Sequence, residues 1–164
     1  MRHLLSLVPL GLVACVSLPA QEAGQLAADA ATPELTRDDA IRAAVFRHLF
    51  THNVSGQQTL AEVYCLQVEG ERDPSPALLE ALAAEQPRVR PVSACVAGTD
   101  DVRERATDQR GLVFRVDKIR LRGRRAVVEG GYFEAGLSAS GNTYVVEQRG
   151  ERWVVTSERL NWIA

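Results

Sequence analysis

The sequence predicts an α+β fold in which helices pack on a curved antiparallel sheet with a C-terminal four-strand meander. Two N-terminal segments carry apolar residues at helical spacing, within 36–53 and 75–86. From residue 112 onward, apolar and polar residues alternate in four runs separated by glycine-containing turns. The stretch 36–164 is long enough to form one domain with its own core, so we expect a single α+β domain there.

The first helix has two possible starts. Either Thr32 caps it, with Pro33 at the first helical position, or Thr36 caps it, with Asp39 three residues later. The segment Asn53–Gly56 ends it. The apolar face of this helix consists of Ile41, Val45 and Leu49, with Phe46 and Phe50 beside them.

A central strand and a second helix follow. Thr59–Val68 is apolar on both faces, which is typical of a strand buried inside a sheet. Ser75 and Pro76 then open a helix that Pro87 ends. Pro91–Val96 is a short extended piece, and 98–110 is a charged loop.

The C-terminal half alternates as a meander. The four predicted strands are Leu112–Leu121, Ala126–Phe133, Thr143–Arg149 and Arg152–Trp162, with turns at Gly123, Gly136–Asn142 and Gly150. In the first strand the apolar phase slips near Asp117 and Lys118, which predicts a β-bulge, and Gly130-Gly131 marks a bend in the second.

This order of elements resembles the nuclear-transport-factor-2-like superfamily. The likeness covers roughly 36–162 and includes the C-terminal hairpin Tyr144–Val146 and Gly150–Val155. The order of elements also resembles a cystatin-like fold, in which a helix packs on a curved sheet. The first resemblance implies a cone-shaped interior, which in that superfamily hosts isomerase-like and cyclase-like enzymes and also many non-catalytic modules.

The first twenty residues resemble a bacterial lipoprotein export signal. Met1-Arg2-His3 supplies a cationic start, and an apolar run of about ten residues follows, too short to span a bilayer as a mature helix. The tetrad Leu12-Val13-Ala14-Cys15 matches a lipobox, whose cysteine takes the lipid. We therefore expect a signal peptide at 1–14, lipidation of Cys15 and a flexible tether at 15–35.

Two alternatives to lipidation remain open. Ordinary cleavage could follow Ala20, although Leu18 then occupies a position where a small residue is usual. Cys15 could also be only an apolar residue of a cleaved segment. Lipidation predicts an envelope protein held at a membrane, with the outer membrane favoured because Val16 follows the cysteine; the alternatives predict a soluble periplasmic or secreted protein.

Three cysteines constrain the covalent structure. Cys15 is lipidated or removed, which leaves Cys65 and Cys95 as a pair, and we expect these two to form a disulfide in an oxidising compartment. Two buried free thiols are the alternative.

Composition argues against nucleic acid as a general partner, because the formal net charge is −2. One basic cluster stands out, formed by Arg115, Lys118, Arg120, Arg122, Arg124 and Arg125. It could meet anionic lipid headgroups or an acidic partner, or it could protect an exposed hairpin against aggregation. We expect a membrane contact through the N-terminal lipid, with an envelope protein as a further partner.

The candidate chemical residues point to no particular reaction. His48 and His52 have the spacing of a metal-binding pair, but a third ligand is missing and we interpret them as the end of the helix, so no metal and no cofactor is expected. The acidic residues of the loop 98–110 lack calcium-loop spacing and are interleaved with arginines, which predicts a solvated loop; they are Asp100, Asp101, Glu104 and Asp108.

A general acid or base would need a carboxylate held inside the cone. The strand residues that could supply one are Asp117, Glu129, Glu134 and Glu147, and Tyr64, Tyr132 and Tyr144 could line the same space. No catalytic residue is assigned. We predict a non-catalytic binding or interaction module, and the alternative is a small-molecule-binding or isomerase/cyclase-like enzyme with a conical pocket.

Overall fold

Strands dominate this protein. The computed structural model describes residues 34–53, 55–56, 58–136 and 138–164, of which 51% lie in strands and 21% in helices. The elements in chain order are α1 (Arg37–Thr51), a 3₁₀ turn (Gln58–Leu60), β1 (Val63–Val68), α2 (Pro76–Ala81), β2 (Arg88–Pro91), a second 3₁₀ turn (Val92–Ala94), β3 (Cys95–Ala97), β4 (Val102–Glu104), β5 (Arg110–Arg122), β6 (Arg125–Ala135), β7 (Ser138–Arg149) and β8 (Arg152–Ile163). The predicted signal peptide, Cys15 and most of the tether lie outside the described residues.

Both helices begin at side-chain caps. The Thr36 hydroxyl accepts a hydrogen bond from the amide of Asp39 at 3.1 Å, so the second of the two predicted starts of α1 is confirmed. The Ser75 hydroxyl accepts one from the amide of Leu78 at 3.1 Å, with Pro76 at the first helical position of α2, as predicted. These starts depend on neighbouring residues alone.

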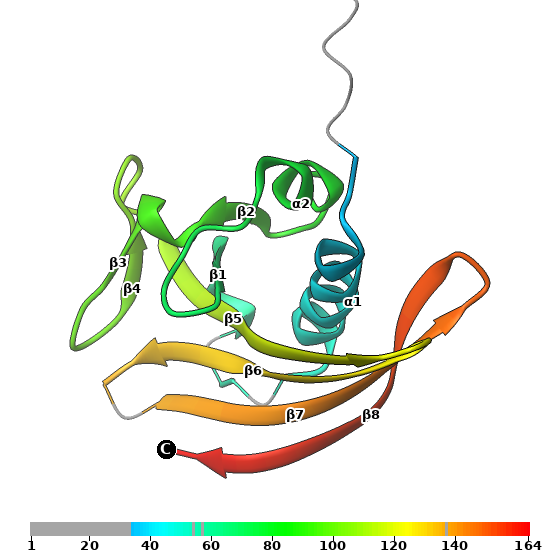
Figure 1. Cartoon of the computed structure of the whole chain (residues 1–164). Coiled ribbons are helices and arrows are strands. Elements are labelled where there is room, and N and C mark those ends of the chain that lie inside the picture. The colour runs from blue at the N-terminus through cyan, green and yellow to red at the C-terminus, as the bar shows by residue number, and fades with distance from the viewer. Residues whose placement is uncertain (1–33, 54, 57, 137) are drawn as a thin grey trace, which may run out of the picture. The chain divides into compact units, whose positions relative to one another are not determined.

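The predicted fold class is wrong. All eight strands of the described chain belong to one mixed sheet, whose main path runs β2-β1-β5-β6-β7-β8, with β4 paired to β5 and β3 to β4 (Figure 1). β1 pairs in parallel with both β2 and β5, whereas β5 to β8 pair antiparallel in chain order. The fold is therefore a large mixed sheet accompanied by two α-helices, and not helices packed on an antiparallel sheet.

The parallel pairs explain the composition of β1. A strand between two parallel neighbours is covered on both faces and therefore reads as a continuous apolar run. Only one of its six residues, Gln67, is not fully buried. A parallel connection also needs a crossover, and α2 supplies it between β1 and β2.

The larger core lies between α1 and the concave face of the sheet (Figure 1). Alternation along β1 sends Tyr64 and Leu66 to this side. Helix α1 contributes Ile41, Val45 and Phe46, and each of these is fully buried.

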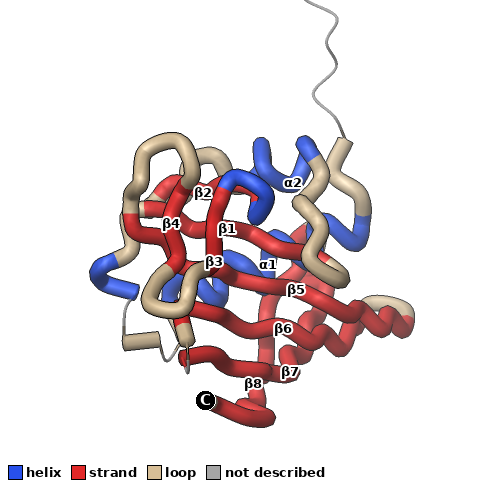
Figure 2. The backbone as a smooth tube through the Cα atoms, turned by 90° about the vertical axis from the view of Figure 1, so that its left-hand side faces the viewer, coloured by secondary structure: helices blue, strands red, loops and turns tan. Residues whose placement is uncertain are grey.

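A smaller core lies on the opposite face of β1 and β5. It contains Val63, Cys65 and Val113 of the sheet, with Cys95 and Val102 from β3 and β4. Figure 2 shows β3 in front of the sheet and α1 behind it. The β3–β4 hairpin therefore covers the convex side, in a segment for which we predicted an extended piece followed by a charged loop.

Two irregular places in β5 and β6 were indicated by the sequence. The predicted bulge in β5 is confirmed, because the β5–β6 register shifts between Val116 and Ile119.

At Gly131 of β6, a Cβ atom would lie 2.0 Å from the carbonyl oxygen of Ser140 in β7. The two strands can approach this closely only because residue 131 has no side chain.

Candidate functional site

The disulfide joins the sheet to the hairpin on its convex face. Cys65 of β1 and Cys95 of β3 are bonded, with a Cα–Cα distance of 6.4 Å and a sequence separation of 30 residues. Both cysteines are buried in the smaller core. The predicted pairing is therefore present, and it holds β3 against β1 in the absence of a direct ladder between them.

The concave interior is filled by aromatic rings. Phe50 stacks on Tyr64 with ring centroids 4.9 Å apart, and Phe114 packs against both rings at 5.4 Å and 4.9 Å. Tyr132 and Tyr144 are also buried on this face. The space in which a conical pocket was considered is thus occupied by side chains of the protein itself.

A polar cluster connects the last turn of α1 to β8. The Nε2 atom of His48 lies 2.8 Å from Oε2 of Glu158, and the amide of Asn142 donates to the other oxygen of that carboxylate. The Ser140 hydroxyl donates to Oδ1 of Asn142 at 2.9 Å. The cluster therefore forms a hydrogen-bonded chain of four side chains, and Asn142 and Ser140 are buried within it.

Tyr144 lies beside this chain. Its ring meets the His48 ring edge-on at 5.8 Å, and its buried hydroxyl has no hydrogen-bond partner of normal geometry among the described residues. Burial, reinforced by the negative charge of Glu158, raises the pKa of the Tyr144 hydroxyl well above its usual range. The phenol is therefore neutral at any physiological pH.

His52 continues the cluster toward solvent. Its ring stacks on that of His48 with centroids 4.7 Å apart, and its Nδ1 lies 2.6 Å from the hydroxyl of Thr51. The two histidines do lie at the end of α1, as interpreted from the sequence. No group of three or more metal-ligating side chains occurs among the residues that the structure describes.

The sequence did not identify Glu158, Asn142 and Ser140 as partners of His48. Glu158 is 110 residues from His48, so no local spacing connects them. The one available signal was the polar character of Asn142 and Glu158 within apolar strands, which does not specify a partner.

Of the four strand carboxylates considered, only Glu134 is buried on the described sheet. It accepts hydrogen bonds from the hydroxyls of Ser55 at 2.8 Å and Ser138 at 2.9 Å. Glu129 is partly exposed and pairs with Arg120 at 2.7 Å, and Glu147 lies 4.0 Å from Arg125.

Asp117, the fourth, is partly exposed beside the bulge in β5. Burial raises the pKa of its carboxyl, and the neighbouring Arg115, 3.7 Å away, acts in the opposite direction.

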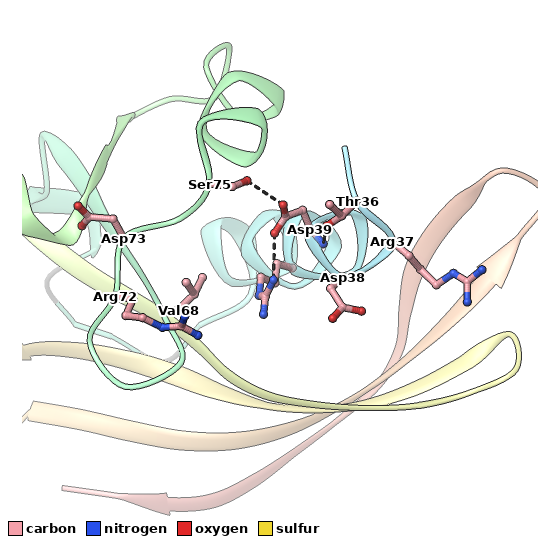
Figure 3. A pocket seen from close by; sticks show the side chains of 9 residues that line it. Thr36, Arg37, Asp38, Asp39, Val68, Arg72, Asp73 and Ser75 are labelled. Atoms are coloured by element: carbon pink, nitrogen blue, oxygen red, sulfur yellow. Dashed lines mark hydrogen bonds and ion pairs between the residues drawn. The ribbon is translucent and has the colours of Figure 1, made fainter. Parts of the chain in front are cut away.

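A second polar network surrounds the N-terminus of α1 (Figure 3). The buried carboxylate of Asp39 accepts from Arg42 at 3.0 Å and from the Ser75 hydroxyl at 2.7 Å, while Arg42 also reaches Glu69 at 2.9 Å. Asp39, Arg42 and Ser75 line a surface cavity of about 600 Å³. Both oxygens of Asp39 are used within the protein, so this network holds α1 to the start of α2.

The acidic loop is not fully solvated. Asp100, Asp101 and Asp108 are not buried, but Glu104 lies in β4 and is only 3% exposed. Arg88 and Arg90 of the β2 edge pair with its carboxylate, the latter at 2.8 Å, and Thr107 donates to it as well. The hydrogen bond from Arg88 is the largest of the effects that lower the pKa of Glu104 to about 2. Glu104 therefore ties β4 to β2.

The two edges of the sheet differ. β2 has four residues and ends at Pro91, features that discourage pairing with another strand. β8 has twelve residues and no proline, and among the strands that the structure describes it pairs only with β7. Near its end Leu160, Trp162 and Ile163 are 47%, 47% and 55% exposed. β8 is thus a long, partly apolar and uncovered edge.

A groove about 620 Å³ in volume runs between α1 and the first residues of β8. Its floor includes Ala40, Ala43 and Ala44 of the helix and Trp153 of the strand, and His48 lies on its wall. Among the described cavities this is the one that reaches the His48 cluster.

Comparison with protein families, with curated proteins and with solved structures gave no match. Within the described residues, no helix has both the length and the apolar character needed to cross a bilayer. Function must therefore be argued from the residues themselves.

Proposed function

We propose that this protein is a lipid-anchored cell-envelope module that binds a partner protein along β8 and performs no catalysis. The observation that carries the proposal is the uncovered β8 edge with its exposed Leu160, Trp162 and Ile163. An exposed strand edge offers unpaired backbone donors and acceptors, and apolar side chains beside it give an added strand something to pack on.

The occupant that best fits this edge is an extended segment of another protein with alternating apolar residues. An extended segment can satisfy the backbone groups of the edge, which a compact surface cannot. Leu160 is paired across from Asn142 on the concave side, and Trp162 lies over Gly141 on the other side, so both faces of the edge carry an apolar contact.

Two features support the envelope location. The Cys65–Cys95 disulfide is the kind of bond that persists in an oxidising compartment. The tetrad Leu12-Val13-Ala14-Cys15 supplies the lipidation site of the proposal. The filled concave interior favours a binding module over an enzyme with a conical pocket, because buried aromatic side chains occupy the place of that pocket.

The binding proposal is tested by site-specific photocrosslinking in the native host. A photoreactive residue at Leu160 is expected to give an adduct with one envelope protein, mapped to an extended segment of that protein. The adduct should disappear when Ile163→Lys is added. A photoreactive residue at Ala106, on the exposed β4–β5 turn, serves as the matched control. Absence of an adduct, or an adduct only with a second copy of the chain, would overturn the proposal.

A small-molecule-binding function is the second candidate, and one observation favours it. The His48–Glu158 pair could act as an acid–base group toward a ligand in the groove between α1 and β8. The probe is the apolar, anionic dye 8-anilinonaphthalene-1-sulfonate. This candidate predicts saturable dye binding that is abolished by Ala44→Trp, which fills the groove, and weakened by His48→Ala. Binding that neither variant changes would exclude it.

A further inference from the structure

The ends of two neighbouring hairpins gather five arginines, and among the described residues only one of them, Arg125, lies within 4.0 Å of a carboxylate. β5 and β6 join at Arg122 and Arg125, and β7 and β8 join at Arg149 and Arg152. The two hairpins are side by side, because the amide of Gln148 donates to the carbonyl of Arg124 at 2.8 Å. We call this group the arginine tip; its members are Arg122, Arg124, Arg125, Arg149 and Arg152.

The arginine tip differs from the rest of the protein in its pairing. Elsewhere most arginines lie against acidic side chains: Arg42 pairs with Asp39, Arg47 with Glu85, and Arg88 and Arg90 with Glu104. In the tip, Arg125 approaches Glu147 only at 4.0 Å. Within the described part of the chain, the other four members make no ion pair.

The local geometry also puts like charges opposite each other. Arg122 is paired across the ladder with Arg125, and Arg149 with Arg152. Directly opposed like charges destabilise a hairpin. Two such pairs lie at adjacent hairpin ends, and among the described residues the one ion pair that acts against this repulsion is the 4.0 Å contact of Arg125 with Glu147.

Protection of a sheet edge accounts for only part of the arginine tip. Charged residues blunt edges against aggregation. Near the tip β5 is itself an edge, because β1 pairs with β5 only from Gly111 to Val116, but β6 and β7 are interior strands there. Two of the four strands in the tip therefore have no edge to protect.

We infer that the arginine tip binds the anionic phosphate headgroups of a lipid bilayer. The guanidinium groups are exposed, they project from two adjacent turns, and their charge is complementary to such a surface. The inference rests on the proposed lipid-anchored function and adds to it a face of the domain that lies against the membrane.

Vesicle co-sedimentation tests the inference independently of lipidation. The probe is the oxidised full chain carrying Cys15→Ser, so that no lipid can be attached. Vesicles of phosphatidylcholine alone are compared with vesicles of phosphatidylcholine and phosphatidylglycerol at three to one. All variants carry the same N-terminal segment, so its contribution cancels.

The key variant replaces Arg122, Arg124, Arg149 and Arg152 by glutamine. The control replaces four exposed arginines outside the tip by glutamine and has the same net charge: Arg37, Arg72, Arg105 and Arg159. We expect the tip variant to lose at least about tenfold in affinity for the anionic vesicles, and the control less than about threefold, because each basic residue near such a surface contributes separately. Raising the salt concentration should remove the preference for anionic vesicles.

Three results would overturn the inference: no preference of the parent chain for anionic vesicles, an equal loss in both variants, or equally tight binding of the tip to polyglutamate. If the tip variant fails to fold, protection of these arginines from trypsin by anionic vesicles, measured on the parent chain, decides instead. A failure of the vesicle assay concerns the arginine tip, whereas a failure of lipid attachment to Cys15 concerns the proposed anchor.

Discussion

The length of the loop that the disulfide closes predicts how much its removal lowers the free energy of unfolding. Cys65 and Cys95 are 30 residues apart, and closing a loop of that length in the unfolded chain corresponds to about 3.6 kcal/mol at 25 °C on the loop-entropy account. Replacing both by alanine also removes two sulfur atoms from the smaller core, which adds about 1 kcal/mol. We therefore expect Cys65→Ala/Cys95→Ala to lower the free energy of unfolding by about 4 to 5 kcal/mol.

The assay is urea unfolding of the full chain, followed by tryptophan fluorescence and by far-ultraviolet circular dichroism. The midpoint should fall, and the slope of stability against urea should rise, because the unfolded chain without the bridge exposes more surface. Thermal unfolding should show a drop in Tm of roughly 10–20 °C.

Reduction provides the internal control. A phosphine reductant should move the unfolding of the parent protein toward that of the double variant and should leave the double variant unchanged. If the parent and the double variant unfold within about 1 kcal/mol of each other, the loop-entropy reasoning does not apply to this domain. If the reductant shifts the double variant, its effect does not come from this bond.

Three further predictions follow from the same structure. Glu104→Gln should lower the free energy of unfolding by about 1–3 kcal/mol at pH 7, because two arginines lose their carboxylate partner. The pKa of Glu104 in the folded protein is about 2, below the ordinary value of 4.5, so its contribution to stability is fully present above pH 4.5 and is lost as the pH falls toward 2. The acid unfolding curves of parent and variant should therefore converge over that range. Gly131→Ala should destabilise by about 2–3 kcal/mol in urea unfolding, because the added Cβ would lie 2.0 Å from a backbone oxygen. Cys15→Ala, or treatment of the native host with globomycin, should leave unprocessed precursor on an immunoblot.

Each of these predictions has a control or a contradicting result. Glu129→Gln removes a carboxylate from an exposed pair and should change stability by less than about 1 kcal/mol. Gly56→Ala adds a Cβ with nothing within 4 Å and should be nearly neutral. A Gly131→Ala variant as stable as Gly56→Ala would contradict the close approach of β6 and β7, and normal processing of Cys15→Ala would contradict the lipobox.

Local features of the fold could be predicted from the sequence because their causes are local. The Thr36 cap, the Ser75-Pro76 helix start and the bulge after Val116 each depend on residues a few positions apart. The direction of strand pairing is not a local property. The apolar run of β1 predicts a central strand, and β1 is one. The same run is also typical of a strand with parallel neighbours, but the parallel pairing was not predicted.

The candidate sites divide in the same way. The sequence identified the cysteine pair, because Cys15 is expected to be lipidated or removed and only two cysteines then remain. The sequence predicted a solvated loop at 98–110. It carries no local signal that Glu104 lies in β4 and pairs with the arginines of β2. The sequence likewise could not predict the partner of His48, because Glu158 lies in a strand near the other end of the chain.

By itself, the sequence determined the start of the second helix, two possible starts for the first, the expected pairing of Cys65 with Cys95, and the lipobox-like tetrad near its N-terminus. The tertiary structure alone decided that the sheet is mixed, that aromatic rings fill its concave face, that β8 pairs with no described strand besides β7, and that two hairpins bring their arginines together. The physical reason is distance along the chain. Capping and phase are fixed by neighbouring residues, whereas edges, filled interiors and charge clusters exist only after segments up to 110 residues apart have packed against one another.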